Sequence, residues 1–123
     1  MCIRDRGLNN LGIWYARLGP GKRSSFPHAH THEEEFVFVL KGELKVWRDG
    51  NTKVFHEGSY VAFPANTGVA HTLINDSTEE VIYLCIGETH EFPDEKIFYP
   101  LNPLRNSECK RQGWLWDCLL YTS

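Results

Sequence analysis

The feature that most constrains this chain is the stretch from Ile13 to Ile86, where short runs of β-branched and aromatic residues are separated by glycine-bearing turns. The strands of β-sandwiches and β-barrels recur with this spacing. Apolar residues at the 3.6-residue period of an amphipathic helix are absent from the stretch. The pattern therefore predicts an all-β fold.

Eight strands are expected in this stretch, which is the number found in a jelly-roll barrel. Glycine accepts positive φ without a steric clash, so Lys41-Gly42, Asp49-Gly50-Asn51 and Glu57-Gly58-Ser59 predict tight turns between strands. The expected strands are Ile13–Leu18, Ser25–His30, Glu35–Leu40, Glu43–Arg48, Thr52–His56, Tyr60–Phe63, Ala70–Asn75 and Val81–Ile86.

One short helix is expected near the C-terminus. Asn102 suits the cap position, Pro103 suits the first helical position, and Gly113 suits the end of a helix. These signals predict a helix over Pro103–Gln112.

Two features offer surface for further packing. After its first residue, the strand expected at Glu35–Leu40 is apolar on both of its alternating faces, so we expect one face to line the barrel and the other to meet a second sheet or subunit. Trp114 and Trp116 follow the helix, and we expect them to pack against the barrel rather than to form a partner surface.

At 123 residues the chain fits one domain. We expect the barrel to span residues 12–87 and a tail that carries the helix to span residues 88–117. Residues 1–6 and 118–123 resemble peptides that arise when sequencing-adaptor DNA at the edges of metagenomic reads is translated, and they are left out of the fold prediction. Frayed natural termini are the alternative.

Composition and charge exclude several classes of protein. A hydrophobic content of 41% exceeds that of a disordered chain, and no apolar run approaches the roughly 18 residues of a membrane helix. The net charge is −3 and the basic residues form no stripe, so neither nucleic acid nor a membrane is an expected partner. Without a secretion signal the expected location is cytoplasmic, and Cys85 is expected to be an inert core thiol.

The residues that carry chemistry lie in three separate segments. His28 and His30 are two residues apart, a spacing that puts both side chains on one face of a strand. Glu35 opens the next expected strand, and His71 lies at the start of a later one. Imidazole and carboxylate ligands together suit Fe, Mn, Ni, Co or Zn better than calcium or magnesium. We therefore expect His28, His30, Glu35 and His71 to bind one divalent metal ion.

Two motifs in this region match a known family. The first combines two histidines, a glutamate and a glycine, and the second combines two glycines, a proline, a histidine and an asparagine. The residues on them are His28, His30, Glu35 and Gly42 in the first motif, and Gly58, Pro64, Gly68, His71 and Asn75 in the second. The stretch from Gly12 to Gly87 resembles the cupins, in particular small single-domain bacterial cupins.

The resemblance implies a cupin jelly-roll barrel and a homodimer. Four protein ligands leave open positions on an octahedral ion, so we expect a metal-dependent enzyme of isomerase, decarboxylase or dioxygenase type that acts on a small polar metabolite. A non-catalytic small-molecule-binding or sensor protein is the alternative, and a structural dimer module with an idle site is a weaker one. Glu33 and Glu34 are candidates for proton transfer, although such loop residues are normally solvated. Asn75 is expected to satisfy backbone groups at the turn that follows it.

Overall fold

The structure is a computed structural model that describes residues 2–4, 8, 10–88 and 96–115. Within these residues the elements are β1 (Cys2–Arg4), β2 (Leu11–Leu18), β3 (Ala29–His30), β4 (Glu35–Lys41), β5 (Leu44–Arg48), β6 (Asn51–Phe55), β7 (Tyr60–Phe63), β8 (His71–Ile74), β9 (Val81–Glu88), β10 (Ile97–Phe98) and α1 (Pro103–Gln112). One sheet has the strand order β1-β2-β9-β4-β7, a second has the order β6-β5-β8, and β10 pairs with β3.

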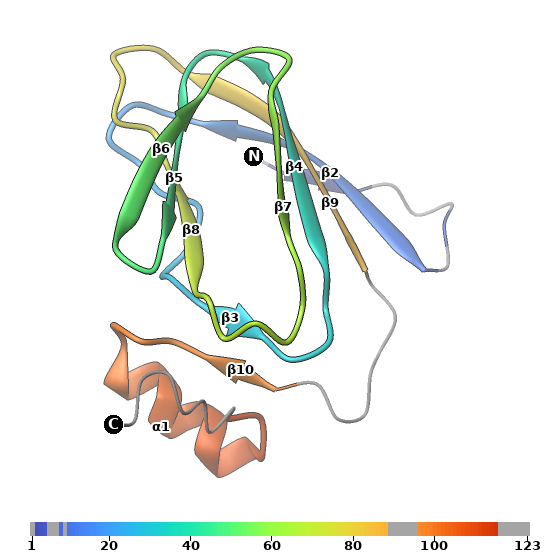
Figure 1. The fold of residues 1–123 in the computed structure, drawn as a ribbon, viewed down its shortest axis with the longest axis vertical. Helices are drawn as coiled ribbons and strands as arrows, with labels where there is room; N and C mark the ends of the chain where they lie inside the picture. The colour runs from blue at the N-terminus through green and yellow to red at the C-terminus, as the bar shows by residue number, and fades with distance from the viewer. Residues whose placement is uncertain (1, 5–7, 9, 89–95, 116–123) are drawn as a thin grey trace.

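The two larger sheets enclose one apolar core and form a barrel (Figure 1). On β4, Val37 and Val39 are fully buried, whereas Phe36 and Phe38 are partly exposed. This alternation turns every second residue of the strand inward. The core consists of Ala16, Leu18, Val37, Val39, Leu44, Val46, Val61, Phe63, Leu73, Val81 and Tyr83. The predicted all-β barrel is confirmed.

Two of the predicted turns have the positive φ values that their residues were expected to supply. Asp49 and Gly50 have φ angles of 47° and 87°, as in the type I′ turn that suits a two-residue hairpin between β5 and β6. Gly42 has a φ angle of 87°, and a Cβ atom there would lie 3.1 Å from the carbonyl oxygen of Glu80. A larger residue at Gly42 would therefore crowd the start of β9 as well as strain the turn.

The segment predicted as a strand at Ser25–His30 forms only the short strand β3. The residues before β3 run along β8 through separate hydrogen bonds, such as the one that the Ser24 N–H donates to the Leu73 carbonyl at 2.8 Å. Pro27 has no N–H group and interrupts a continuous ladder. The other seven predicted strands are confirmed, with ends that differ by no more than two residues.

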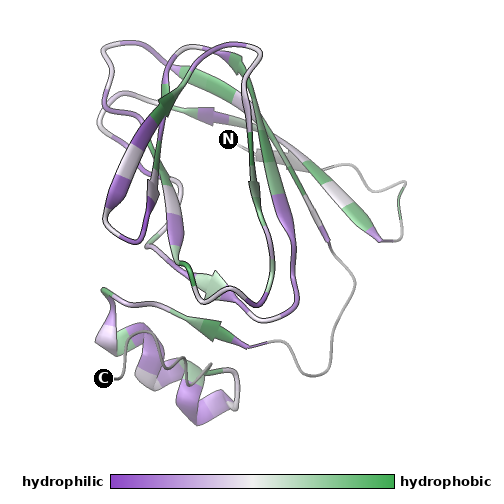
Figure 2. Ribbon diagram, in the orientation of Figure 1, coloured by the Kyte–Doolittle hydropathy of each residue, from purple (hydrophilic) through white to green (hydrophobic). Residues whose placement is uncertain are grey.

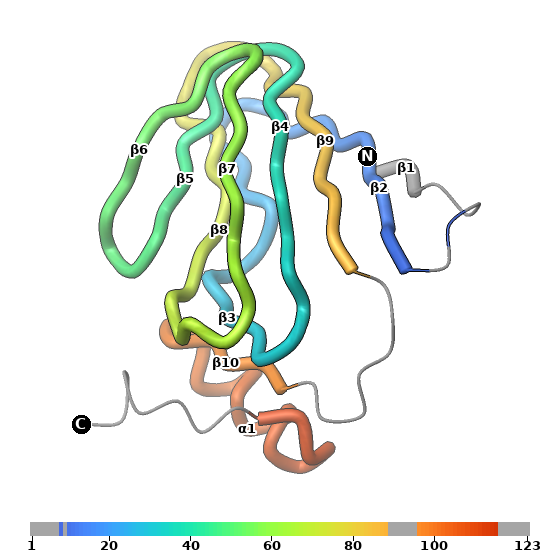
Figure 3. Tube along the Cα trace, turned by 45° about the vertical axis from the view of Figure 1, so that its right-hand side comes forward, coloured from blue at the N-terminus to red at the C-terminus, as the bar shows by residue number. Residues whose placement is uncertain are grey.

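The predicted helix is confirmed at both ends. The Asn102 side chain accepts a hydrogen bond from the Arg105 N–H at 3.1 Å, and Gly113 ends the helix with a φ angle of 79°. The helix α1 and strand β10 lie together at the end of the barrel next to β3 (Figure 1 and Figure 3). Most of α1 is hydrophilic (Figure 2), and no helix in the described part of the chain has the length and apolar character that a membrane crossing needs.

The remaining differences between the predicted and the observed structure lie near the two ends of the chain. Neither β1, which pairs with β2, nor β10, which places Ile97 opposite His30, was expected from the sequence. Trp114 is 50% exposed, so its expected packing against the barrel stays a prediction and could cover only part of the side chain. Trp116 and residues 118–123 lie outside the described residues.

Asn75 is a fully buried polar residue that joins three segments. Its amide nitrogen donates hydrogen bonds to the carbonyls of Leu18 at 2.8 Å and Glu79 at 2.7 Å. Its amide oxygen accepts hydrogen bonds from the backbone N–H of Ser77 at 3.0 Å and from the Ser77 hydroxyl at 2.7 Å. The expected role of Asn75 at the following turn is confirmed, and it extends to the end of β2.

Candidate metal centre

His28 and His71 face each other across a β-bridge. The His71 N–H donates to the His28 carbonyl at 3.0 Å, and the His28 N–H donates to the His71 carbonyl at 3.2 Å. Directly opposite residues of a β-pair point their side chains to the same face, and the two ring centroids lie 5.0 Å apart. The bridge therefore aligns two imidazoles from distant parts of the sequence.

Glu35 brings a carboxylate to the same place. It lies two residues before the buried Val37, on the inward face of β4, and its Oε2 is 3.3 Å from Nε2 of His71. One ligand atom each from His28, Glu35 and His71 lie within 4.8 Å of one another. Two imidazole nitrogens and one carboxylate oxygen in this arrangement form a candidate metal centre.

The fourth predicted ligand, His30, lies beside this group of atoms rather than within it. Its ring centroid is 4.9 Å from that of His28, with an interplanar angle of 89°, and its Nδ1 is 3.7 Å from Oε2 of Glu33. Pairing of β3 with β10 fixes the backbone of His30 next to the centre. A role for His30 as a ligand stays a prediction.

Hydrogen bonds orient the His28 ring so that Nε2 is available to a metal. Its Nδ1 lies 2.8 Å from the carbonyl oxygen of Phe26 and 3.3 Å from the hydroxyl of Ser25. A carbonyl oxygen only accepts hydrogen bonds, so we assign the proton to Nδ1 and the lone pair to Nε2. Burial, together with the charges of His30 and His71, lowers the pKa of His28 to about 4. The hydrogen bond to Phe26 acts in the opposite direction and raises this pKa. The ring is therefore neutral at pH 7, the form that binds metals.

Glu35 is held in its ionised form by its neighbours. Burial acts to raise its pKa, but the hydrogen bond and charge of His71 and the hydrogen bond from Cys85 lower the pKa of Glu35 to about 2. The His71 ring is itself stacked on Phe63, with centroids 3.8 Å apart and an interplanar angle of 10°. These contacts fix a charged carboxylate next to two imidazoles, as a divalent cation requires.

We expect the metal-free protein to lose stability as the pH falls from about 6.5 to about 4. The pKa of His28 is lowered from 6.5 to about 4 on folding, so in this range the unfolded chain binds a proton that the folded protein does not. The pKa of Glu35 is lowered from 4.5 to about 2, so its contribution is lost at still lower pH. Urea unfolding at pH 7.5 and pH 4.5 should show a decrease of roughly 1–3 kcal/mol. The variant His28→Gln should show a smaller decrease, and equal decreases in the two proteins would contradict the assignment to His28.

Cys85 is a contact of the centre that the sequence analysis missed. Its thiol donates a hydrogen bond to Oε1 of Glu35 at 3.0 Å while the side chain packs against the core, and its expected inertness stays a prediction. Strand alternation places Cys85 on the inner face of β9, which was the available signal. The contact itself depends on the pairing of β9 with β4, where Cys85 lies opposite Val37.

Replacing Cys85 with alanine is expected to weaken metal binding by about tenfold, because Glu35 loses the donor that orients its second carboxylate oxygen. Cys85→Ser is the matched control, since it retains a donor and should bind close to wild-type affinity. Calorimetric titration with Mn²⁺ measures both constants. An alanine variant with wild-type affinity, or a serine variant as weak as the alanine one, would refute this role.

The C-terminal segment also reaches the centre. The Tyr99 ring centroid is 5.7 Å from that of His28. The Tyr99 N–H donates to the side-chain oxygen of Asn106 at 2.8 Å, and the Asn106 amide donates back to the Tyr99 carbonyl at 2.6 Å. Helix α1 thus holds an aromatic ring next to one of the candidate ligands.

Two of the hollows that adjoin the centre are lined by Trp14, Glu35 and Cys85. The larger one, which we call the barrel cavity, has a volume of about 350 Å³ and includes His28 in its wall. The smaller one, which we call the rim hollow, has a volume of about 220 Å³ and includes Glu33. Spaces of this size suit small metabolites rather than polymers.

These features define an antiparallel β-barrel protein with a histidine and carboxylate centre between its sheets. Residues 14–87 match the family model of the cupin domain. The chain belongs to the cupin family, as the two motifs predicted.

Known proteins of this family extend the comparison. A solved structure of a sugar phosphate isomerase from the cupin superfamily of Silicibacter pomeroyi matches with a TM-score of 0.73 and 31% identity, over 80% of this chain and 63% of that chain. A structure from Acidithiobacillus ferrooxidans, named provisionally as a sugar phosphate isomerase, matches with a TM-score of 0.71 and 31% identity, over 80% and 65% of the two chains. Quercetin 2,3-dioxygenase of Bacillus subtilis is 32% identical over 71 residues, which are 57% of this chain and 21% of that protein. This chain thus spans less than two thirds of either isomerase and about a fifth of the dioxygenase.

Proposed function

We propose that this cupin is a metal-dependent enzyme that isomerises a small sugar-like metabolite. The observation that carries the proposal is the convergence of His28, Glu35 and His71 within 4.8 Å, next to the barrel cavity. Isomerisation of a hydroxy-carbonyl compound moves a proton between neighbouring carbon atoms. It needs an electrophile at the developing oxyanion and a site sheltered from water.

The donor set fits one divalent transition metal, namely Fe, Mn, Ni, Co or Zn. His28, Glu35 and His71 would hold the ion, and His30 would be the fourth ligand. When bound, the ion supplies Lewis-acid polarisation of a substrate carbonyl or enolate oxygen. A neutral His28 and an ionised Glu35 are the protonation states that metal binding requires at pH 7.

Residues around the centre would provide the proton transfer. Glu33 lines the rim hollow, and its carboxylate lies 3.7 Å from His30 with 39% of the side chain exposed. We assign the transfer of a proton between substrate carbons to Glu33, with Glu34 as the second candidate. Trp14 and the buried Tyr83 form part of the barrel cavity wall and would exclude water from the reacting atoms.

Two comparisons favour isomerisation over the other chemistries of the family. Both isomerase structures match over 80% of this chain at 31% identity. The match to quercetin dioxygenase supports oxidative cleavage as the second candidate, over a shorter part of this chain. A sensor that binds a small molecule without turnover is the third candidate.

Metal content and turnover distinguish these functions. Protein purified without chelator should hold about one equivalent of a transition metal by elemental analysis, and less than about a tenth of an equivalent after reconstitution would refute the proposal. The loaded protein should exchange the C2 proton of glucose 6-phosphate, or a C1 proton of fructose 6-phosphate, in D₂O, as read by NMR, and His28→Ala should abolish the exchange. Oxygen uptake with quercetin would instead identify a dioxygenase. Full loading without either reaction would assign the protein to the sensor class.

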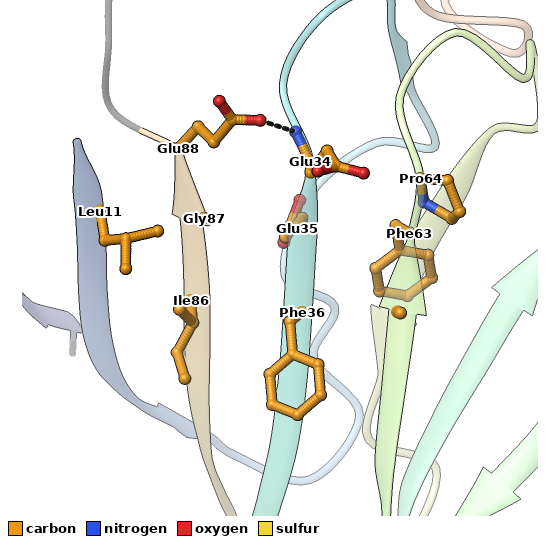
Figure 4. Close-up of a pocket in the computed structure, with 10 residues that line it drawn as sticks. Leu11, Glu34, Glu35, Phe36, Phe63, Pro64, Ile86, Gly87 and Glu88 are labelled. Carbon is orange, nitrogen blue, oxygen red and sulfur yellow. Dashed lines mark hydrogen bonds between the residues drawn. The ribbon is translucent and has the colours of Figure 1, made fainter.

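We further propose that the protein is a homodimer that associates through the outer face of its five-stranded sheet. Phe36 and Phe38 of β4 lie opposite Ile86 and Leu84 of β9, on the face that points away from the core. Figure 4 shows Leu11, Ile86 and Phe36 side by side on β2, β9 and β4. A contiguous apolar face of this kind is commonly covered by a partner. Light scattering at micromolar concentration should give the mass of two chains, and the mass of one chain would remove this part of the proposal.

A further inference from the structure

The rim hollow is strongly acidic. Glu33, Glu34 and Glu88 line it together with Glu35, and none of the described residues that line it is an arginine or a lysine. Glu34 directly precedes β4 and Glu88 ends the neighbouring strand β9, and the Glu34 N–H donates to Oε1 of Glu88 at 3.2 Å (Figure 4). An anionic group of a bound molecule is therefore repelled from this side of the centre.

The barrel cavity, in contrast, is lined by two arginines, Arg17 and Arg23, as well as by Glu35. The charge of Arg17 is already paired, because its guanidinium lies 2.8 Å from Oε1 of Glu80. The guanidinium of Arg23 lies 4.5 Å from the centroid of the Phe26 ring, and no carboxylate in the described part of the chain pairs with it. Arg23 is thus the cavity-lining cation whose charge remains available to a ligand.

Ser24 and Ser25 line the cavity next to Arg23. Hydrogen bonds attach Ser24 to β8: its N–H donates to the Leu73 carbonyl at 2.8 Å, and its hydroxyl oxygen accepts from the Leu73 N–H at 3.2 Å. The Ser25 hydroxyl lies 3.3 Å from Nδ1 of His28. This segment is therefore fixed to the strand that begins with His71, and a guanidinium and a hydroxyl donor are held in the cavity wall that also contains His28.

We propose that the barrel cavity binds a small metabolite with one anionic end, a phosphate or a carboxylate, which Arg23 and Ser24 hold. Guanidinium groups bind both anions through paired, charge-assisted hydrogen bonds. The neutral, hydroxyl-bearing end of the metabolite turns toward Glu35 and the acidic rim hollow. The orientation of the reacting end rests on the proposed function, whereas the anion site rests on the charges of the cavity alone.

Titration of glucose, gluconate and glucose 6-phosphate into the Mn²⁺-loaded protein tests the proposal. At least one of the two acids should bind about tenfold or more tightly than glucose, and the tighter acid identifies the anion. Arg23→Gln should remove this preference, and Arg23→Lys, which keeps the charge, should retain part of it. Arg17→Gln is the matched control and should keep the full preference, since Arg17 is already paired with Glu80.

The proposal is overturned if glucose binds as tightly as both acids, or if Arg23→Gln and Arg17→Gln reduce the preference equally. An unchanged melting temperature of Arg23→Gln shows that the variant is folded. Inorganic phosphate titrated into the metal-free protein separates this result from the proposed function. If the metal-free protein binds phosphate and Arg23→Gln weakens this binding about tenfold, the anion site is supported even without a metal. If the wild-type protein binds neither phosphate nor the two acids, the anion site is refuted.

Discussion

Replacing His71 with alanine is expected to lower the affinity for a divalent transition metal by about a hundredfold or more. Mutating a residue that merely hydrogen-bonds to a metal ligand already lowers metal affinity by up to about a hundredfold, and His71 is itself a candidate ligand. His71 is 6% exposed and supplies one of the three close ligand atoms of the centre, 3.3 Å from Glu35. Its removal leaves two of the three close ligand atoms, with His30 as the remaining predicted ligand. Calorimetric titration with Mn²⁺ or Zn²⁺ measures the loss.

The matched control is His56→Ala. The His56 side chain is 66% exposed, and its Nδ1 lies 3.9 Å from Oε1 of Glu43. No role in metal binding is assigned to His56, so this variant should bind metal as the wild type does. Since His71 also stacks on Phe63, circular dichroism and thermal melting of the metal-free variant must show that it is folded. A folded His71→Ala protein with wild-type metal affinity would exclude His71 from the centre.

Replacing Asn75 with alanine is expected to lower the free energy of unfolding by roughly 3–5 kcal/mol. The amide is fully buried and uses both of its donors and both acceptor positions, on Leu18, Glu79 and Ser77. Alanine would leave the buried bond to the Leu18 carbonyl and the partly buried bonds to the Glu79 carbonyl and the Ser77 N–H unmade, and an unpaired buried group costs about 1–3 kcal/mol. Urea unfolding monitored by tryptophan fluorescence gives the difference.

Ser77→Ala serves as the comparison for Asn75. It removes the hydroxyl bond to Asn75 but keeps the backbone bond between the two residues, and the site is only partly buried, so a loss of about 1 kcal/mol is expected. The prediction fails if the alanine variant of Asn75 is no less stable than that of Ser77.

Much of the barrel could be predicted because its signals are local. The alternation that buries Val37 and Val39, and the Asp49-Gly50 turn, are encoded within a few neighbouring residues. The helix bounds were predictable for the same reason, since Asn102 caps one end. Strand β10 has no such signal, because two residues carry no periodicity and their structure depends on pairing with β3.

Some residues of the candidate site could likewise be predicted from local motifs, whereas others could not. His28, Glu35 and His71 could be predicted because their residue types and spacings follow motifs that can be read along the chain. The contact of Cys85 with Glu35 depends on which strands are neighbours, and the approach of Tyr99 to His28 depends on where the tail docks. Neither is encoded in a short stretch of sequence.

The bridge between His28 and His71 has a consequence for how the protein acquires an ion. Two backbone hydrogen bonds between distant segments bring His71 to His28, so no short piece of the chain contains the complete ligand set. Such long-range pairings form only when the intervening chain has been closed into a loop. A partly folded chain therefore offers an incomplete ligand set that lacks His71, and the rate of metal uptake during refolding should report the closure of the barrel.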